Sequence, residues 1–178
     1  AGVTHPNVSN LNFGPGQTIA NLVPVKIGTN GAINFANANG SVHVILDVVG
    51  YYDATTGSRF HPMAPTRILD DRDGTGLSGP WGPDQTRTLT VAAEGKPIPT
   101  GATGVVANIT ATNASAGSFI TIYPNPTMRP NASTLNFGPG ETIPNLSVTK
   151  LGNGKLDIYN QTGTVDIIAD AVGWFSIG

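Results

Sequence analysis

Cysteine is absent from the 178 residues, and charged side chains make up only 11% of them. Without cysteine there is no disulfide framework, no thiolate zinc site and no cysteine nucleophile. Soluble domains usually carry about 25% charged residues, and the net charge here is −2. The composition therefore argues against a basic surface for nucleic acid. No apolar run reaches the roughly 18 residues that suggest a membrane-spanning helix.

Glycine and proline are abundant instead, with 23 and 14 residues, and 39% of the chain is apolar. That apolar fraction is sufficient for a buried core and argues against charge-driven disorder. Asn, Thr and Ser are plentiful, whereas the strong helix formers Glu, Lys and Leu are scarce. The balance favours short strands joined by tight turns.

An internal repeat is the strongest signal in the sequence. The stretch HPNVSNLNFGPGQTIANLVPVKIG begins at His5, and RPNASTLNFGPGETIPNLSVTKLG begins at Arg129. After a one-residue deletion the similarity continues from Gly31 and Gly154 to the ends of two apolar runs. We name residues 1–52 copy A, residues 53–128 segment B and residues 129–178 copy A′. The order A–B–A′ predicts a partial repeat over residues 1–52 and a complete unit over residues 53–178.

The coarse structure predicted is β throughout. VHVILDVVGYY from Val42 and VDIIADAVGWF from Val165 are nearly continuous apolar runs, which are typical of central strands. Apolar residues alternate along GVVANITAT, which predicts a strand with one buried face. After the turn NASAG, the run SFITIYP predicts the second strand of a hairpin. Two Asn-Gly pairs predict further hairpins, and residues 88–96 are the only candidate helix. The alternating inward positions are Val105, Ala107, Ile109 and Ala111.

Many short strands separated by turn residues predict an all-β, antiparallel β-sandwich of jelly-roll-like type, built from the repeat of about 124 residues. Five motifs carry a resemblance to a known family: PTRILDDRDGTG, GATGVVANITATNASAGSFITIYP, ASTLNFGPGETIPN, the hairpin at Lys150 and DIIADAVGWF. They resemble a β-rich repeat module of secreted and surface-attached bacterial proteins, chiefly actinobacterial. The resemblance implies an extracellular location and no assigned activity. The chain departs from the family pattern at Asp71, where the module usually has Thr.

The densest polar cluster is the turn RILDDRDGTG. Asp71, Asp73 and Thr75 alternate like the opening of an oxygen-ligand calcium loop, but the distal bidentate Glu of such a loop is missing. The favoured interpretation is a structural turn whose carboxylates pair with Arg67 and Arg72 or accept backbone N–H bonds. No metal or other cofactor is therefore expected, with calcium as the weak alternative.

Asp47 and Asp170 occupy equivalent positions inside the two apolar runs. A carboxylate in such a place is costly unless it is paired. The sequence predicts two buried structural carboxylates, each bound to backbone N–H groups, to Lys26 or Lys150, or to Arg67. Two identical environments argue against a catalytic pair, because such a pair needs two differently tuned groups.

Exposed aromatic rings can stack on sugars, and Trp81 in the loop GPWGPD is the best candidate for a ligand contact. Its alternative is a plug that closes one end of the sandwich. Three further ligand-contact candidates end the apolar runs: Tyr51, Tyr52 and Trp174.

No catalytic residue is predicted. The histidines are not spaced as metal ligands, and neither a GxSxG elbow nor a phosphate-binding glycine loop is present. The chain is therefore expected not to be an enzyme but a secreted or cell-surface structural module. It would associate with copies of itself or with neighbouring repeat units, because copy A has apolar strands and no segment B of its own. Such contacts could continue head to tail into a filament. The alternative is a module that binds polysaccharide or cell wall.

Overall fold

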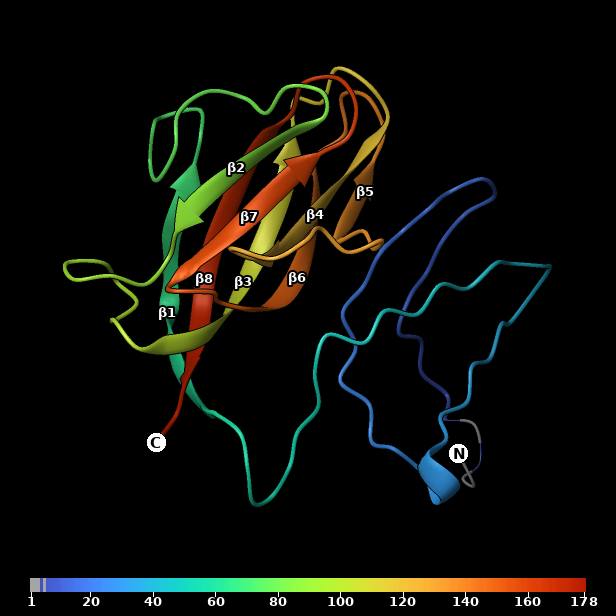
Figure 1. Ribbon diagram of the computed structural model, residues 1–178. Helices are drawn as coiled ribbons and strands as arrows, with labels where there is room; N and C mark the ends of the chain where they lie inside the picture. Colours follow the sequence, from blue (N-terminus) through green and yellow to red (C-terminus); the bar gives the residue numbers. More distant parts are fainter. Residues whose placement is uncertain (1–3, 5) are drawn as a thin grey trace.

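The computed structural model describes residue 4 and residues 6–178. All of its strands lie between Arg59 and Ser176, where they form a β-sandwich (Figure 1). The strands are β1 (Arg59–Asp70), β2 (Gln85–Thr90), β3 (Ala102–Thr112), β4 (Ser118–Pro124), β5 (Leu135–Phe137), β6 (Ile143–Lys150), β7 (Lys155–Asn160) and β8 (Asp166–Ser176).

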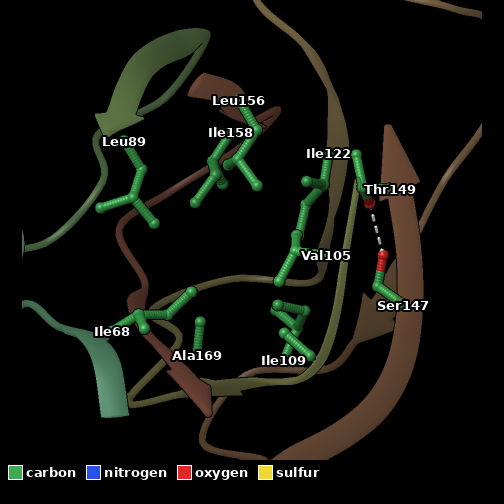
Figure 2. A pocket seen from close by; sticks show the side chains of 11 residues that line it. Ile68, Leu89, Val105, Ile109, Ile122, Ser147, Thr149, Leu156, Ile158 and Ala169 are labelled. Atoms are coloured by element: carbon green, nitrogen blue, oxygen red, sulfur yellow. Dashed lines mark hydrogen bonds between the residues drawn. The ribbon is translucent and has the colours of Figure 1, made fainter. Parts of the chain in front are cut away.

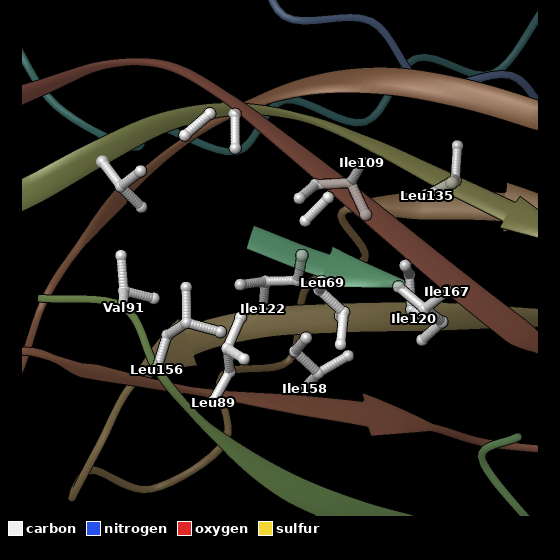
Figure 3. Close-up of a cluster of buried hydrophobic side chains, with 14 of the residues drawn as sticks. Leu69, Leu89, Val91, Ile109, Ile120, Ile122, Leu135, Leu156, Ile158 and Ile167 are labelled. Carbon is white, nitrogen blue, oxygen red and sulfur yellow. The ribbon is translucent and has the colours of Figure 1, made fainter. Parts of the chain in front are cut away.

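Two four-stranded antiparallel sheets face each other, with strand orders β1-β8-β3-β6 and β2-β7-β4-β5. The predicted central strand over the second apolar run is confirmed, because β8 pairs on both sides. The alternation predicted for β3 is also confirmed, since Val105, Ala107, Ile109 and Ala111 are all buried in the core. Branched aliphatic side chains from both sheets fill the space between them (Figure 3).

Strands from segment B and copy A′ alternate in both sheets. Segment B supplies β1 to β4 and copy A′ supplies β5 to β8. In the two strand orders every hydrogen-bonded neighbour of a B strand is an A′ strand, and the reverse holds as well. Neither half therefore makes a sheet by itself, and the fold is a complex of two interlocking halves joined in one chain.

The predicted hairpins need correction. β3 and β4 are joined by a short turn but belong to opposite sheets, and the same is true of β6 and β7. The turn at Asn153-Gly154 has the expected positive φ values, 52° and 75°, and closes through Gly152 and Lys155. The positive φ values of this turn were therefore predicted correctly. The chain nevertheless crosses from one sheet to the other there, because β6 and β7 both pair with strands of segment B. Residues 88–90 of the candidate helix form the end of strand β2, and the rest of it contains no helix.

Copy A differs most from the expectation. Of its described residues none is in a strand, and the only regular element before β1 is the 3₁₀ turn η1 (Thr29–Gly31). The strand predicted from Val42 to Tyr52 does not form. These residues are exposed, and the chain runs beside the sandwich as an open loop (Figure 1). The physical reason follows from the alternation: the strands of an A-type half pair only with B strands, and the B strands of this chain are already paired with A′.

Candidate functional site

The acidic turn after β1 is an ion-pair cluster on the edge of the sandwich. The buried carboxylate of Asp70 accepts bonds from Arg67 and Arg72, each at 2.8 Å. Arg67 also binds Asp170 on β8, with Nε–Oδ1 at 2.9 Å and Nη2–Oδ2 at 3.2 Å. The Arg72 side chain, through its hydrogen bonds, lowers the pKa of Asp70 to about 2, so this carboxylate stays charged. The cluster ties β1 to β8 and leaves no carboxylate oxygen of Asp70 free for another ligand.

The neighbouring carboxylates are also engaged locally. Asp73 accepts the backbone N–H of Thr75 at 2.9 Å, as in an Asx turn. Asp71 is buried and its Oδ2 accepts the N–H of Ile167 on β8 at 3.1 Å. Among residue 4 and residues 6–178, no group of three or more His, Cys, Asp or Glu side chains is arranged to hold a metal ion. The calcium alternative at Asp71, Asp73 and Thr75 gains no support from this geometry.

The two carboxylates predicted as buried differ from each other. Asp170 is half-buried and paired with Arg67, one of the three partners that the sequence offered. Asp47 is exposed, and it makes no hydrogen bond or ion pair with the described residues. The prediction of a buried Asp47 is wrong in this chain. The sequence around Asp47 is typical of a central strand. Strand β1, which carries Arg67, is already paired with β8, so Asp47 has no arginine to bind.

Substitution separates the two carboxylates. We expect Asp170→Ala to lower the free energy of unfolding by about 1 kcal/mol, because the Arg67 pair is partly solvent-exposed and screened. Asp47→Ala should leave the melting temperature unchanged. Thermal unfolding followed by circular dichroism measures both, and equal losses in the two variants would contradict the assignment of Asp47 to an unpaired segment.

Trp81 does not lie on the surface. Its side chain is fully buried, its Nε1–H donates to the carbonyl of Ile158 at 2.9 Å, and its backbone pairs with Val165. The Arg87 guanidinium lies 4.3 Å from the ring centroid. A ring enclosed in this way has no free face for a sugar, so the ligand-contact prediction is corrected in favour of the plug.

The other three aromatic candidates lie in different settings. Trp174 is half-buried on β8 and stacks on His61, with ring centroids 4.1 Å apart and an interplanar angle of 13°. The next residue, Phe175, contacts Phe60. Tyr51 and Tyr52, their equivalents in copy A, are about four-fifths exposed. The structure does not bring the four candidate aromatics together into one site.

The space between the sheets offers no chemistry either. It is lined by aliphatic side chains such as Val105, Ile122 and Ala169, and its only polar groups are two hydroxyls on β6 (Figure 2). Ser147 and Thr149 bond to each other at 2.8 Å, which satisfies both. The unfilled volume is about 10 Å³, so this space is a small packing gap in the core.

The largest feature without a structural partner is the apolar surface of copy A. Its large hydrophobic side chains are exposed to extents that no residue of the sandwich core approaches, for example 84% for Ile45 and 81% for Val48. Monomeric proteins seldom expose so many apolar side chains along one segment. The exposed set is Val8, Leu11, Phe13, Ile19, Val23, Val25, Ile27, Phe35, Val42, Val44, Ile45, Leu46, Val48, Val49, Tyr51 and Tyr52.

Most of these exposed residues align with buried residues of copy A′. Leu11 and Phe13 align with buried Leu135 and Phe137. The correspondence continues along the whole copy: the inward positions Ser147, Thr149, Leu151, Leu156, Ile158, Val165, Ile167, Ala169 and Ala171 align with Val23, Val25, Ile27, Ile33, Phe35, Val42, Val44, Leu46 and Val48. The apolar pattern of these residues predicts burial. The signal that they would be exposed is the second A-type copy beside a single segment B.

Three comparisons with known proteins, by family model, by sequence and by structure, found no match for this chain. No helix of the described residues is long and apolar enough to cross a membrane.

Proposed function

We propose that this chain is a non-catalytic structural module of an extracellular or cell-surface assembly, and that copy A is its association segment. The observation behind the proposal is the exposure of a core-like set of side chains in copy A, next to a sandwich that is already complete. Exposed surface of this kind is buried when a partner is present, with a gain of about 25 cal/mol for each Å² of apolar area.

The order of the strands in the two sheets supports the same proposal. The strand orders β1-β8-β3-β6 and β2-β7-β4-β5 support a jelly-roll-like sandwich built from one B-type and one A-type half. A repeat of about 124 residues then corresponds to one sandwich. The resemblance to a repeat module of secreted bacterial proteins supports a secreted or surface location, with neighbouring repeat units as partners.

The alternative function, binding of polysaccharide or cell wall, has less support. Its principal residue, Trp81, is enclosed by the core. The remaining candidates Tyr51 and Tyr52 belong to the apolar segment, where association accounts for their exposure.

The test is deletion of residues 1–52. All strands and all core residues lie beyond this segment, so the remaining chain should keep its melting temperature. We expect the full chain to give a mass above that of a monomer, rising with concentration, in size-exclusion chromatography with light scattering. The shortened chain should be monomeric and should bind far less of a hydrophobic dye.

A matched control retains the segment but removes its apolar character: Val44→Ser, Leu46→Ser and Val48→Ser combined. These residues are exposed, so the substitutions should leave the fold intact and should weaken association as the deletion does. A full chain that is monomeric at every concentration would show that copy A is not an association segment.

A further inference from the structure

Copy A keeps the local hydrogen bonds of copy A′ even though it forms no strand. The Gly14 N–H donates to Gln17, as Gly138 does to Glu141. The amide of Asn21 donates to the carbonyl of Asn10 at 2.5 Å, and its counterpart Asn145 donates to the carbonyl of Thr134 at 2.8 Å. Two further pairs agree: Asn12 and Asn136 each bind a serine three residues before, and Asn37 and Asn160 each bind carbonyls two and three residues later. Copy A therefore keeps four local hydrogen-bond patterns of an A-type half without its ladders.

Copy A also keeps two residues whose counterparts in A′ contact strand β1 of segment B. A Cβ on Gly173 would lie 2.3 Å from the ring of Phe60 on β1 and 3.0 Å from the carbonyl oxygen of His61, so a side chain there would require both to shift. Its counterpart Gly50 has nothing within 4 Å and its φ is not positive, so nothing in its present surroundings requires glycine. Asp47 likewise matches Asp170, the partner of Arg67. These two residues fit the face that β1 presents to β8.

The inward positions of copy A point to the same partner. Where A′ has Ser147 and Thr149, copy A has Val23 and Val25, and where A′ has Ala169, copy A has Leu46. All three A′ residues line the small gap between the sheets (Figure 2). Copy A would therefore direct more apolar volume into that space than A′ does, and it would bury no hydroxyl pair there.

The chain connection permits copy A to reach segment B. In the sandwich Arg59 of β1 lies opposite Ser176 of β8, and Ser176 aligns with Asp53. If copy A replaced A′, only residues 54–58 would have to connect two adjacent antiparallel strands, which is an ordinary loop length. Those residues already turn: Asp53 accepts the N–H groups of Thr55 and Thr56, and Gly57 has a φ of 98°. Figure 1 shows the chain bending below the sandwich before it enters β1.

We infer that copy A is an interchangeable second half of the sandwich, which binds the strands of segment B in the place that A′ occupies. This inference deepens the proposed function by naming the surface that the association segment recognises: the B-type face formed by β1, β2, β3 and β4. Binding would form six ladders, because every ladder of the sandwich joins a B strand to an A-type strand.

One segment B for two A-type copies has a consequence for assembly. Whichever A-type copy pairs with segment B, the other copy stays exposed. Exchange within one chain therefore always leaves one A-type copy free to associate. The exposed copy is matched to the B-type half of a neighbouring repeat unit. A series of units could then pair each B with the A-type copy before it or after it, as in a circular permutation.

The test uses the full chain with a charge placed in A′. Ala171 is fully buried on β8, whereas its counterpart Val48 is 81% exposed. Ala171→Asp should expel A′, and copy A should replace it. Hydrogen exchange followed by mass spectrometry should then show new protection over residues 42–50 and lost protection over residues 166–176, with a cooperative thermal transition retained. Val48→Asp alone should change neither, and Ala171→Asp with Val48→Asp should abolish the transition.

A second pair of variants introduces a bulky side chain instead of a charge. Gly173→Leu would meet Phe60, and Gly50→Leu is the matched change in copy A. We expect the same order: Gly50→Leu silent, Gly173→Leu folded through copy A, and both together unfolded. The inference is overturned if the A′ variants melt like the doubly substituted chains, or if residues 166–176 stay protected in them.

These experiments are run at dilution, where the protein is monomeric, so they do not depend on association. A full chain that never associates but rescues Ala171→Asp through copy A would overturn the proposed function and support interchangeable halves. A chain that associates through copy A but does not rescue Ala171→Asp would support the proposed function and overturn interchangeable halves.

Discussion

Replacing Trp81 by alanine is expected to lower the free energy of unfolding by about 4 kcal/mol. The ring is the largest of the fully buried side chains, so its removal leaves a cavity between the sheets that the surrounding strands cannot close. The carbonyl of Ile158 loses the indole N–H at 2.9 Å, and Arg87 loses the ring face that it covers. Urea denaturation of the variant and of the parent chain measures the difference.

The matched control is Trp174→Ala, which removes the same side chain from a half-exposed position on β8. The loss there should be clearly smaller, because the ring contacts His61 and is partly in water already. A Trp81→Ala variant that kept its stability but lost binding to a polysaccharide would reinstate the ligand-contact role.

Much of the sandwich could be predicted because the residues concerned decide their structure locally. The alternation through Val105 and Ala107 specifies which face of β3 is buried, whatever its neighbours are. The Asn153-Gly154 pair specifies a turn with positive φ for the same reason. The apolar run of β8 favours an interior place in a sheet, and β8 is hydrogen-bonded to a neighbour on each edge.

Which strands pair with each other could not be predicted from such local patterns. The turn after Thr112 looks the same whether it returns the chain to its own sheet or sends it to the opposite one, and here it does the second. Asp47 and Asp170 have nearly the same sequence around them, yet one is exposed and the other is bound to Arg67. Both outcomes depend on which B strands are unoccupied, and no local pattern contains that information.

The environment of Asp71 produces the second large effect, on the pH dependence of stability. Burial raises the pKa of this carboxyl to about 7, and the charges of Asp166 and Asp70 act in the same direction. The N–H of Ile167 bonds to Oδ2 and opposes the shift, while Oδ1 is buried with no hydrogen-bond partner among the described residues. A proton on the carboxyl group removes the cost of a buried charge.

The folded chain therefore holds a proton at Asp71 that the unfolded chain, with an ordinary aspartate pKa of 3.8, has lost. Between pH 4 and pH 7 the folded state binds more protons, so stability falls as the pH rises through this window. The full effect of about three pKa units corresponds to about 4 kcal/mol at 1.36 kcal/mol for each unit. Asp70 has its pKa lowered to about 2, so its contribution is lost only below about pH 4, outside this window.

We expect the parent chain to unfold at a higher urea concentration at pH 4.5 than at pH 7.5, and Asp71→Asn to remove most of that difference. Asparagine keeps a carbonyl oxygen for the N–H of Ile167 and carries no charge, so at pH 7.5 the variant should be more stable than the parent. Asp73→Asn is the matched control, because it removes a charge from the same turn at an exposed position and keeps the acceptor for Thr75. Equal stability of the parent chain at the two pH values would show that Asp71 is ionised in the folded state and that its buried oxygen has a partner.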